Sequence, residues 1–294
     1  MAVIEVEGLT KAYGDTLANE DLDFSIEAGE IFGYLGPNGA GKSTTIRQLM
    51  GFQTPTAGTA RIFGNDVRND RALRGAKARI GFLPGEPAFT PSVTGREFLD
   101  YQAELKGDER RDELLGLFTP PLDRRIREYS TGNKQMLAIV QAFMHDPDLL
   151  VMDEPTSGLD PLKQEAFHDF LRGERDHGTT VFFSSHILGE VRRVCDRVGI
   201  IRDGRLITVE IVEELLARGG KQVRLHTETP LTEAALDIDG VVGFASEGRE
   251  AQFTFTGDYD ALFAALADYR IVDIEIDEPP IEEVFMHFYG GDAE

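Results

Sequence analysis

One stretch of the chain has the residue types and spacing of a phosphate-binding loop. Residues 36–44 follow the pattern G-x-x-x-x-G-K-S and add a threonine. In such a loop the glycines let backbone N–H groups point at phosphate oxygens, the lysine reaches the β- and γ-phosphates, and the serine hydroxyl can bind Mg²⁺. We therefore predict that nine residues hold the phosphates of a nucleotide: Gly36, Pro37, Asn38, Gly39, Ala40, Gly41, Lys42, Ser43 and Thr44.

The flanking residues favour this interpretation over a glycine-rich turn that binds nothing. Residues 31–35 form an apolar run typical of a buried strand, and residues 44–50 have helical character. A loop between them places phosphates at a helix N-terminus, where free backbone N–H groups and the helix dipole favour anions.

Two neighbouring acids close a second apolar run. Residues 148–154 read Asp-Leu-Leu-Val-Met-Asp-Glu, so a strand core leads directly into Asp153 and Glu154. Side chains alternate between the faces of a strand, so adjacent acids at its end can take different roles. Asp153 suits the outer coordination sphere of Mg²⁺, and Glu154 suits polarising a water for attack on a γ-phosphate. The alternative is a solvated strand end, but buried strands rarely run into charge without a purpose.

Three further motifs stand in a fixed order along the chain. Tyr-Ser-Thr-Gly-Asn-Lys-Gln at 129–135 lies between the phosphate-binding loop and the two acids, and Ser-Gly-Leu-Asp at 157–160 and Ser-Ser-His at 184–186 come after the acids. With these motifs the chain resembles the ATP-binding cassette (ABC) ATPases. That family orders an aromatic residue, a Walker A loop, a Gln loop, an LSGGQ-like signature, a Walker B strand, a D-loop and a switch histidine. The resemblance runs from Met1 to about Arg218.

The resemblance implies roles for single residues, and it implies ATP and Mg²⁺ as cofactors. Tyr13 stands where the family stacks an aromatic ring on adenine. Asp153 and Glu154 match the metal-binding acid and the catalytic base. His186 matches the residue that contacts the γ-phosphate, and Asp160 belongs to the D-loop at the nucleotide.

The resemblance also implies a head-to-tail dimer with a second copy or a related ATPase. Ser130 and Gly132 open a predicted helix, and a helix N-terminus is a good anion site. In ABC ATPases this site faces the γ-phosphate held by the Walker A loop of the partner. ATP binding then joins the two copies, and hydrolysis with loss of phosphate releases them.

Two positions depart from the family pattern. Gly85 stands where the Gln loop usually has glutamine, although Glu86 beside it could substitute. The usual glutamine touches Mg²⁺ or the attacking water and senses the membrane partner. Without it, the sequence does not indicate how the nucleotide site communicates with the membrane partner. Thr131 places a β-branched side chain where a glycine would allow close approach of backbones. Because Ser130 and Gly132 remain, we expect a working but slower site.

The composition is strongly acidic. The 294 residues carry 52 acids and 30 bases, for a formal net charge of −22, so we expect no non-specific binding to nucleic acid. Arginine outnumbers lysine by 23 to 7. Acid excess with little lysine is typical of salt-accumulating (halophilic) organisms, in which high salt screens the repulsion. The alternative is an ordinary acidic protein from a GC-rich genome, which also favours arginine.

The sequence predicts a cytoplasmic subunit that needs a separate membrane protein. Cys195 is the only cysteine, so we expect neither a disulfide within the chain nor a cysteine-based metal cluster. No secretory signal is evident, and no apolar run approaches the roughly 18 residues needed to cross a bilayer. A separately encoded permease would therefore form the pathway and hold this chain at the inner face of the membrane.

The predicted fold is α/β, with a P-loop NTPase core over 1–218. The core combines an N-terminal antiparallel β subdomain within 1–30 and a parallel sheet with flanking helices. A helical subdomain over about 87–147 carries the signature, and its first helix follows an N-cap at Thr94. Core strands are expected near 149–153, 179–184 and 197–202.

Residues 222–294 are predicted to form a small α+β accessory domain that carries 17 acids and 3 bases. Its pattern, β-α-β-β-α-β, is the ferredoxin-like plan. We expect Phe263 beside Leu262 on the buried side of a helix over 259–269, and we expect Val272 and Ile274 on one strand face. A last helix is expected after Pro280. Such a domain resembles the C-terminal domain of many drug and antibiotic exporter ATPases, and its acidity is expected to be solvated surface.

Two classes of function compete. The first is the ATP-hydrolysing subunit of an ABC transporter, and the C-terminal domain favours an exporter over an importer. The second is a soluble ABC ATPase of the translation or DNA-repair type. Those proteins usually have two cassettes, basic surfaces, coiled coils or zinc modules, and this chain has one cassette, no cysteine pairs and strong acidity. The transported substrate cannot be predicted, because its contacts belong to the membrane protein.

Overall fold

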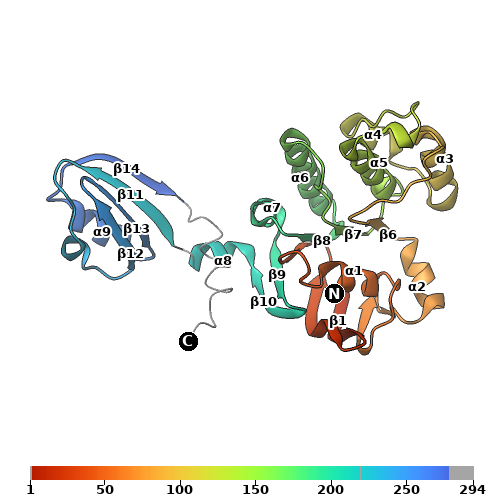
Figure 1. Cartoon of the computed structure of the whole chain (residues 1–294), viewed down its shortest axis with the longest axis horizontal. Coiled ribbons are helices and arrows are strands. Elements are labelled where there is room, and N and C mark those ends of the chain that lie inside the picture. Colours follow the sequence, from red (N-terminus) through yellow and green to blue (C-terminus); the bar gives the residue numbers. More distant parts are fainter. Residues whose placement is uncertain (1, 219, 278–294) are drawn as a thin grey trace. The chain divides into compact units, whose positions relative to one another are not determined.

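The structure, a computed structural model, describes residues 2–218 and 220–277, which form two compact units. The units are Met1–Glu210 and Ile211–Glu294 (Figure 1). The observed division lies inside strand β10 (Arg205–Ile211), ahead of helix α8 (Val212–Arg218). The predicted functional boundary, between 218 and 222, stays a prediction.

A mostly parallel sheet forms the centre of the first unit, as the sequence predicted. Its strand order is β10-β9-β3-β8-β7-β6, and the neighbours from β9 to β6 run parallel. Strands β3, β7 and β8 are buried along their whole length, which explains their apolar composition. Because parallel strands share one carboxyl edge, the segments after β3, β7 and β8 meet there. The core strands are β3 (Ile31–Leu35), β6 (Ile80–Leu83), β7 (Leu149–Asp153), β8 (Thr180–Ser185) and β9 (Arg197–Arg202).

The predicted N-terminal antiparallel sheet is confirmed and packs against this centre. Its order is β2-β1-β4-β5, and β1 pairs antiparallel with β2 and β4. Phe24 on β2 stacks on Phe32 of β3, with ring centroids 5.7 Å apart, and lies 6.1 Å from Phe182 of β8. These rings join the two sheets. The strands are β1 (Ala2–Tyr13), β2 (Thr16–Glu27), β4 (Ala57–Ile62) and β5 (Asn65–Asp66).

The helices of the first unit include the predicted helical subdomain. Thr94 caps α3 through a capping box: its Oγ1 accepts from the Glu97 N–H, and the Glu97 carboxylate accepts from the Thr94 N–H at 2.7 Å. The predicted N-cap is therefore confirmed. The helices are α1 (Lys42–Leu49), α2 (Asp70–Lys77), α3 (Gly95–Lys106), α4 (Arg111–Leu117), η1 (Ile126–Glu128), α5 (Thr131–Phe143), α6 (Pro161–Asp176) and α7 (Leu188–Val194).

The second unit has an antiparallel sheet of order β12-β13-β11-β14 with α9 and the 3₁₀-helix η2 packed in its core. The element order follows the predicted plan, but η2 is a 3₁₀ turn where an α-helix was expected. The predicted last helix lies outside the described residues. The elements are β11 (Lys221–Thr227), η2 (Glu233–Leu236), β12 (Val241–Glu247), β13 (Glu250–Phe255), α9 (Tyr259–Leu266) and β14 (Ile271–Asp277).

Two predicted core positions of this unit are wrong. Phe263 is 49% exposed, because the narrow apolar stripe of the short helix α9 turns Leu262 and Leu266 into the core instead. Val272 is 59% exposed, whereas Ile274 packs against the core. The β11–β14 register shifts at Val272, so this residue is an extra one in its strand and faces the other side.

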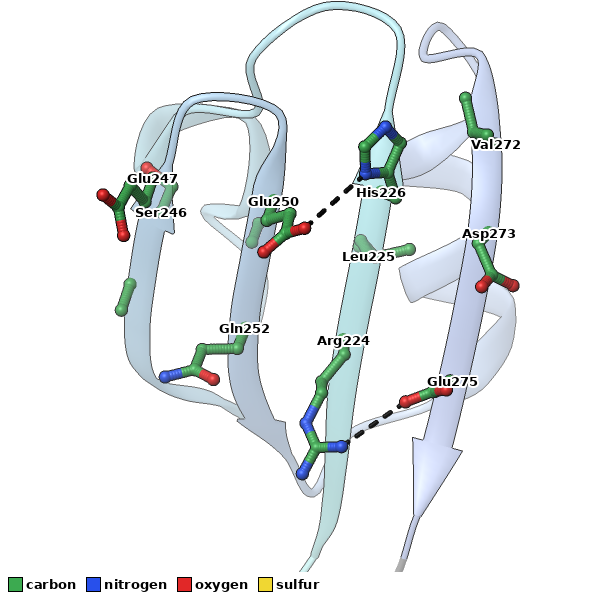
Figure 2. A pocket seen from close by; sticks show the side chains of 12 residues that line it. Arg224, Leu225, His226, Ser246, Glu247, Glu250, Gln252, Val272, Asp273 and Glu275 are labelled. Carbon is green, nitrogen blue, oxygen red and sulfur yellow. Dashed lines mark hydrogen bonds and ion pairs between the residues drawn. The ribbon is translucent and has the colours of Figure 1, made fainter.

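The face of this sheet opposite the core is open and charged (Figure 2). Arg224 lies 3.4 Å from Glu275, and His226 Nδ1 lies 3.9 Å from the Glu250 carboxylate. Among the described residues, Glu247 also borders this face and takes part in neither pair. The face therefore carries more acids than bases, in line with the charge excess of the C-terminal residues.

This charge excess leads to a prediction about salt. We expect the melting temperature and ATPase activity to rise from low to molar KCl, with the C-terminal unit loosening first at low salt. The reason is self-repulsion of a chain of net charge −22, since the Debye length falls from about 10 Å at 0.1 M to about 3 Å at 1 M salt. Melting curves across a KCl series test this. A flat or falling melting temperature would show that the acids are only solvated surface.

Candidate active site

The phosphate-binding loop joins the end of β3 to the start of α1, and it packs closely against the backbone at Ile201. A Cβ atom at Gly36 would lie 2.3 Å from the carbonyl oxygen of Ile201, so only glycine fits there. Gly41, the N-cap of α1, has φ of 104°, a conformation that glycine alone adopts readily. The loop is thus a tightly packed turn, and α1 begins directly after it at Lys42.

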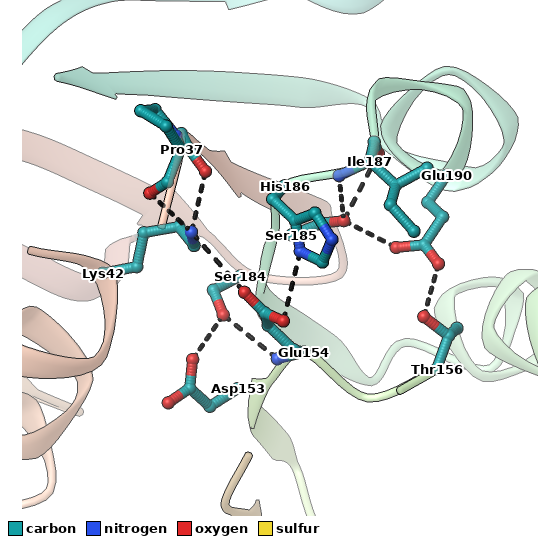
Figure 3. A network of polar contacts seen from close by, with 11 residues as sticks. Pro37, Lys42, Asp153, Glu154, Thr156, Ser184, Ser185, His186, Ile187 and Glu190 are labelled. Atoms are coloured by element: carbon teal, nitrogen blue, oxygen red, sulfur yellow. Dashed lines mark hydrogen bonds and ion pairs between the residues drawn. The ribbon is translucent and has the colours of Figure 1, made fainter. Parts of the chain in front are cut away.

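Lys42 extends from the first turn of α1 back across this loop. Its Nζ donates to the carbonyl oxygens of Gly36 at 2.7 Å and Pro37 at 3.1 Å, and lies 3.5 Å from Glu154 Oε1 (Figure 3). The side chain is 5% exposed. Burial lowers the pKa of Lys42, while the Glu154 carboxylate opposes that shift. The cation is therefore held at the loop beside an acid.

Asp153 and Glu154 take different environments at the end of β7. Ser184 Oγ donates to Asp153 Oδ1 at 2.6 Å and accepts from the Glu154 N–H at 3.1 Å. Glu154 has φ of 48°, a left-handed conformation that costs a non-glycine residue about 1–2 kcal/mol. This turn leaves Asp153 buried and Glu154 partly exposed. Ser184 belongs to the Ser-Ser-His motif, but the sequence predicted no role for it; in the structure it binds both acids at once.

His186 follows β8 and reaches the second oxygen of the same carboxylate. Its Nδ1 lies 3.1 Å from Glu154 Oε2, while Lys42 approaches Oε1. Lys42 and His186, from the segments after β3 and β8, therefore converge on the carboxylate of Glu154 after β7. Their convergence gives a carboxylate fixed from two sides beside a phosphate-binding loop.

A second buried carboxylate supports the loops around this site. Glu190 on α7 is 5% exposed, and it accepts hydrogen bonds from Ser185 Oγ at 2.6 Å and from Thr156 Oγ1. It thereby joins the segment after β8 to the segment after β7. Nothing in the sequence around Glu190 indicates that its carboxylate joins these two segments.

Gly85 lies directly beside Asp153. A Cβ atom at Gly85 would be 3.4 Å from the Asp153 carbonyl oxygen and 3.5 Å from its Oδ2, which are ordinary contacts. Both residues border a cleft of about 520 Å³. The departure from the family pattern therefore removes a side chain beside Asp153, the acid predicted to bind metal, and the space there can hold a Cβ atom. The other residues of the cleft wall include Ser43, Ile46, Arg47, Phe52, Phe82, Pro84, Glu86, Glu154 and Ser157.

The other predicted site residues lie outside this cleft. Ser130 Oγ caps α5 by accepting from the Asn133 N–H, and Asp160 Oδ1 caps α6 by accepting from the Lys163 N–H. That hydrogen bond holds the pKa of Asp160 below its usual range. A Cβ atom at Gly132 would lie 2.8 Å from a D-loop carbonyl oxygen, so the signature and D-loop touch within one chain.

Tyr13 lies at the end of β1 and is 48% exposed. Its hydroxyl donates to Gln53 Oε1 at 2.5 Å, and Lys11 Nζ lies 5.2 Å from its ring centroid. The ring is thus accessible for stacking. Its predicted contact with adenine stays a prediction.

Comparison with known proteins decides the family. A family model described as ABC transporter matches residues 19–157. The bacitracin transport ATP-binding protein BcrA of Bacillus licheniformis is 32% identical over 98% of this chain and 98% of its own length. The daunorubicin/doxorubicin resistance ATP-binding protein DrrA of Streptomyces peucetius is 38% identical over 82% of this chain and 76% of its own. This chain belongs to the ATP-binding subunits of ABC transporters. It is an ATPase of that family, and ATP is its ligand.

Solved structures agree with this assignment. An ATP-binding subunit of an ABC transporter is 31% identical, with a TM-score of 0.66 over 74% of this chain and 92% of that one. The dimeric cassette MJ0796, 24% identical with a TM-score of 0.66 over 71% of this chain and 98% of that one, shows the same fold. The predicted family and P-loop core are confirmed. Within the residues that the structure describes, no helix is long and apolar enough to span a membrane.

Proposed function

We propose that this ABC ATPase drives an exporter through a separately encoded permease. The observation that carries the ATPase part is the convergence of Lys42 and His186 on the Glu154 carboxylate at the phosphate-binding loop. The observation that favours export is the likeness to BcrA, which covers both chains almost completely and so includes the C-terminal unit. BcrA and DrrA are named for bacitracin transport and for daunorubicin resistance.

In this proposal Glu154 is the general base and His186 contacts the γ-phosphate. Lys42 exchanges its hydrogen bonds to the Gly36 and Pro37 carbonyls for bonds to phosphate oxygens, which are stronger because both groups are charged. Glu154 then orients a water for attack on the γ-phosphate. Nucleotide contacts by the remaining loop residues and by Tyr13 follow the predictions above.

Ser43 and Asp153 fit the requirements of a Mg²⁺ site. Both border the 520 Å³ cleft, and they offer the hydroxyl and carboxylate oxygens that Mg²⁺ prefers. Ser184 holds one Asp153 oxygen, which leaves the other for a metal-bound water. When bound, the ion neutralises charge that develops on the β- and γ-phosphate oxygens.

Gly85→Gln is expected to restore an amide oxygen at this metal site. A Cβ atom there makes only ordinary contacts, and Gly85 borders the 520 Å³ cleft, which offers space for the rest of the side chain. We expect an unchanged melting temperature and about a two- to tenfold lower Mg²⁺ concentration for half-maximal ATPase, the range of one modest polar contact. Mg²⁺ titrations at saturating ATP measure this, with Gly85→Ala as the control. Equal Mg²⁺ dependence in Gly85→Gln and Gly85→Ala would contradict it.

We further propose that two copies, or this chain and a related ATPase, assemble head to tail around ATP. Ser130 and Gly132 lie at the N-terminus of α5 and outside the cleft of their own chain, so they are available to the ATP of a partner. Asp160 would act at the same interface. The pair would sit in the cytoplasm, held peripherally at the inner membrane face by the permease.

Drug sensitivity tests the exporter against the alternatives. Cells carrying only Glu154→Gln should become more sensitive to at least one compound in a panel that includes bacitracin and daunorubicin. The permease, a membrane protein with about six apolar segments of transmembrane length, should co-purify with the chain. Unchanged sensitivity with loss of uptake of a nutrient would indicate an importer. Co-purification with ribosomes or DNA instead would indicate a non-transport ATPase.

A further inference from the structure

A buried asparagine touches the phosphate-binding loop from outside the cleft. Asn19 lies on β2 and is 0% exposed. Its Nδ2 donates to the carbonyl oxygen of Gly41 at 3.2 Å, and its Oδ1 accepts from Gln48 Nε2 at 2.9 Å. Gln48 lies on α1 and is also 0% exposed. A polar bridge therefore runs from the loop through β2 to the helix that follows the loop.

The Gly41 carbonyl is the first acceptor of helix α1, and several donors meet at it. It accepts from the Thr45 N–H at 3.0 Å, from Thr45 Oγ1 at 3.2 Å and from Asn19 Nδ2. Because the peptide unit is planar and trans, fixing this carbonyl also fixes the N–H of Lys42, which points the opposite way. That N–H is one of the free donors at the N-terminal end of α1, where an anion binds.

Two buried amides fill this space at a higher cost in free energy than apolar side chains would, so we infer that the bridge does more than pack the core. Burying an amide costs free energy unless all its polar atoms are paired, and an apolar side chain would avoid that cost. Gln48 Oε1 is buried without a hydrogen-bond partner. A Cβ atom at Gly41 would lie 2.5 Å from Asn19 Nδ2, so the asparagine side chain packs directly against the loop backbone at Gly41.

We propose that Asn19 is a positioning residue for the nucleotide site, held in place by Gln48. It fixes the Gly41–Lys42 peptide so that the Lys42 N–H is directed at the phosphates before ATP arrives. The proposal rests on the assignment of ATP phosphates to this loop. Preorganised donors bind more tightly than donors that must first be ordered, so losing Asn19 should weaken nucleotide binding.

Two variants separate positioning from stability. Gln48→Leu leaves the bond from Asn19 Nδ2 to Gly41 but removes the partner of Asn19 Oδ1. Asn19→Leu/Gln48→Leu removes both buried amides, so no orphaned polar atom remains, but the bond to Gly41 is lost. The double variant should therefore be at least as stable as Gln48→Leu and yet bind ATP more weakly. Should the double variant not fold, Asn19→Ala, which leaves space instead of adding bulk, replaces it.

The measurements are the melting temperature and the Kd for ATP with Mg²⁺, at a temperature where each variant is folded. We expect the Kd of the double variant to rise about three- to tenfold. The Kd of Gln48→Leu should rise clearly less than that, because Asn19 Nδ2 keeps its bond to Gly41 although its Oδ1 loses its partner. A double variant with the wild-type Kd, or Kd values that simply follow the melting temperatures, would overturn the proposal. Lys42→Ala is the reference: if it also binds ATP normally, the assignment of the loop fails, not only the role of Asn19.

Discussion

Glu154→Gln is expected to lower ATP turnover at least about 100-fold, the usual contribution of a general base, while ATP still binds. Glutamine keeps the shape of the side chain, so one oxygen can still face Lys42. It removes the charge that draws a proton from water. Because ATP then persists, the variant should also accumulate as an ATP-bound dimer.

A phosphate-release assay measures this turnover, and Glu165→Gln provides the matched control. Glu165 is an exposed residue of α6 away from the cleft, so its substitution removes one acid without touching the site. It should hydrolyse ATP at the wild-type rate. Turnover of Glu154→Gln near that of the control would exclude Glu154 as the base.

Lys42→Ala is expected to abolish tight ATP binding. The phosphates lose a buried cation, and a hydrogen bond to a charged group is worth about 1.5–3 kcal/mol, or roughly a 10- to 150-fold change in Kd. The Gly36 and Pro37 carbonyls also lose their donor, so the loop itself is less well held. Titration with a fluorescent ATP analogue gives the Kd.

Ser130→Arg should behave differently, because Ser130 lies outside the cleft of its own chain. ATP binding to one chain should persist, while dimer formation is blocked by a bulky side chain in the phosphate site of the partner. Sizing chromatography with ATP separates the two variants. If Lys42→Ala and Ser130→Arg lose ATP binding equally, the head-to-tail arrangement is wrong.

The convergence of the candidate site residues could be predicted from sequence because each part of the site is local. The phosphate-binding loop and His186 each follow a short buried strand, and Asp153 and Glu154 stand at the end of another. Parallel strands bring such ends together. The period of the apolar residues likewise predicts the two sheets of the first unit. Sequence patterns therefore predict the position of a side chain well when a single strand or helix determines that position.

The supports of the site could not be predicted, because their partners are distant in sequence. Ser184 binds the Asp153 carboxylate 31 residues away, and Asn19 binds Gly41 22 residues away. A buried serine or asparagine in a strand has no periodic signal that names its partner. The β-bulge at Val272 is another such case, since a register shift is a property of two strands.

One measurement tests the central claim most directly: the mass and nucleotide content of Glu154→Gln in MgATP, compared with MgADP. We expect a dimer with one ATP per chain in MgATP and a monomer in MgADP. The double variant Glu154→Gln/Ser130→Arg should bind ATP and remain a monomer. A Glu154→Gln chain that binds ATP but stays monomeric under conditions where the wild type hydrolyses ATP would contradict the account.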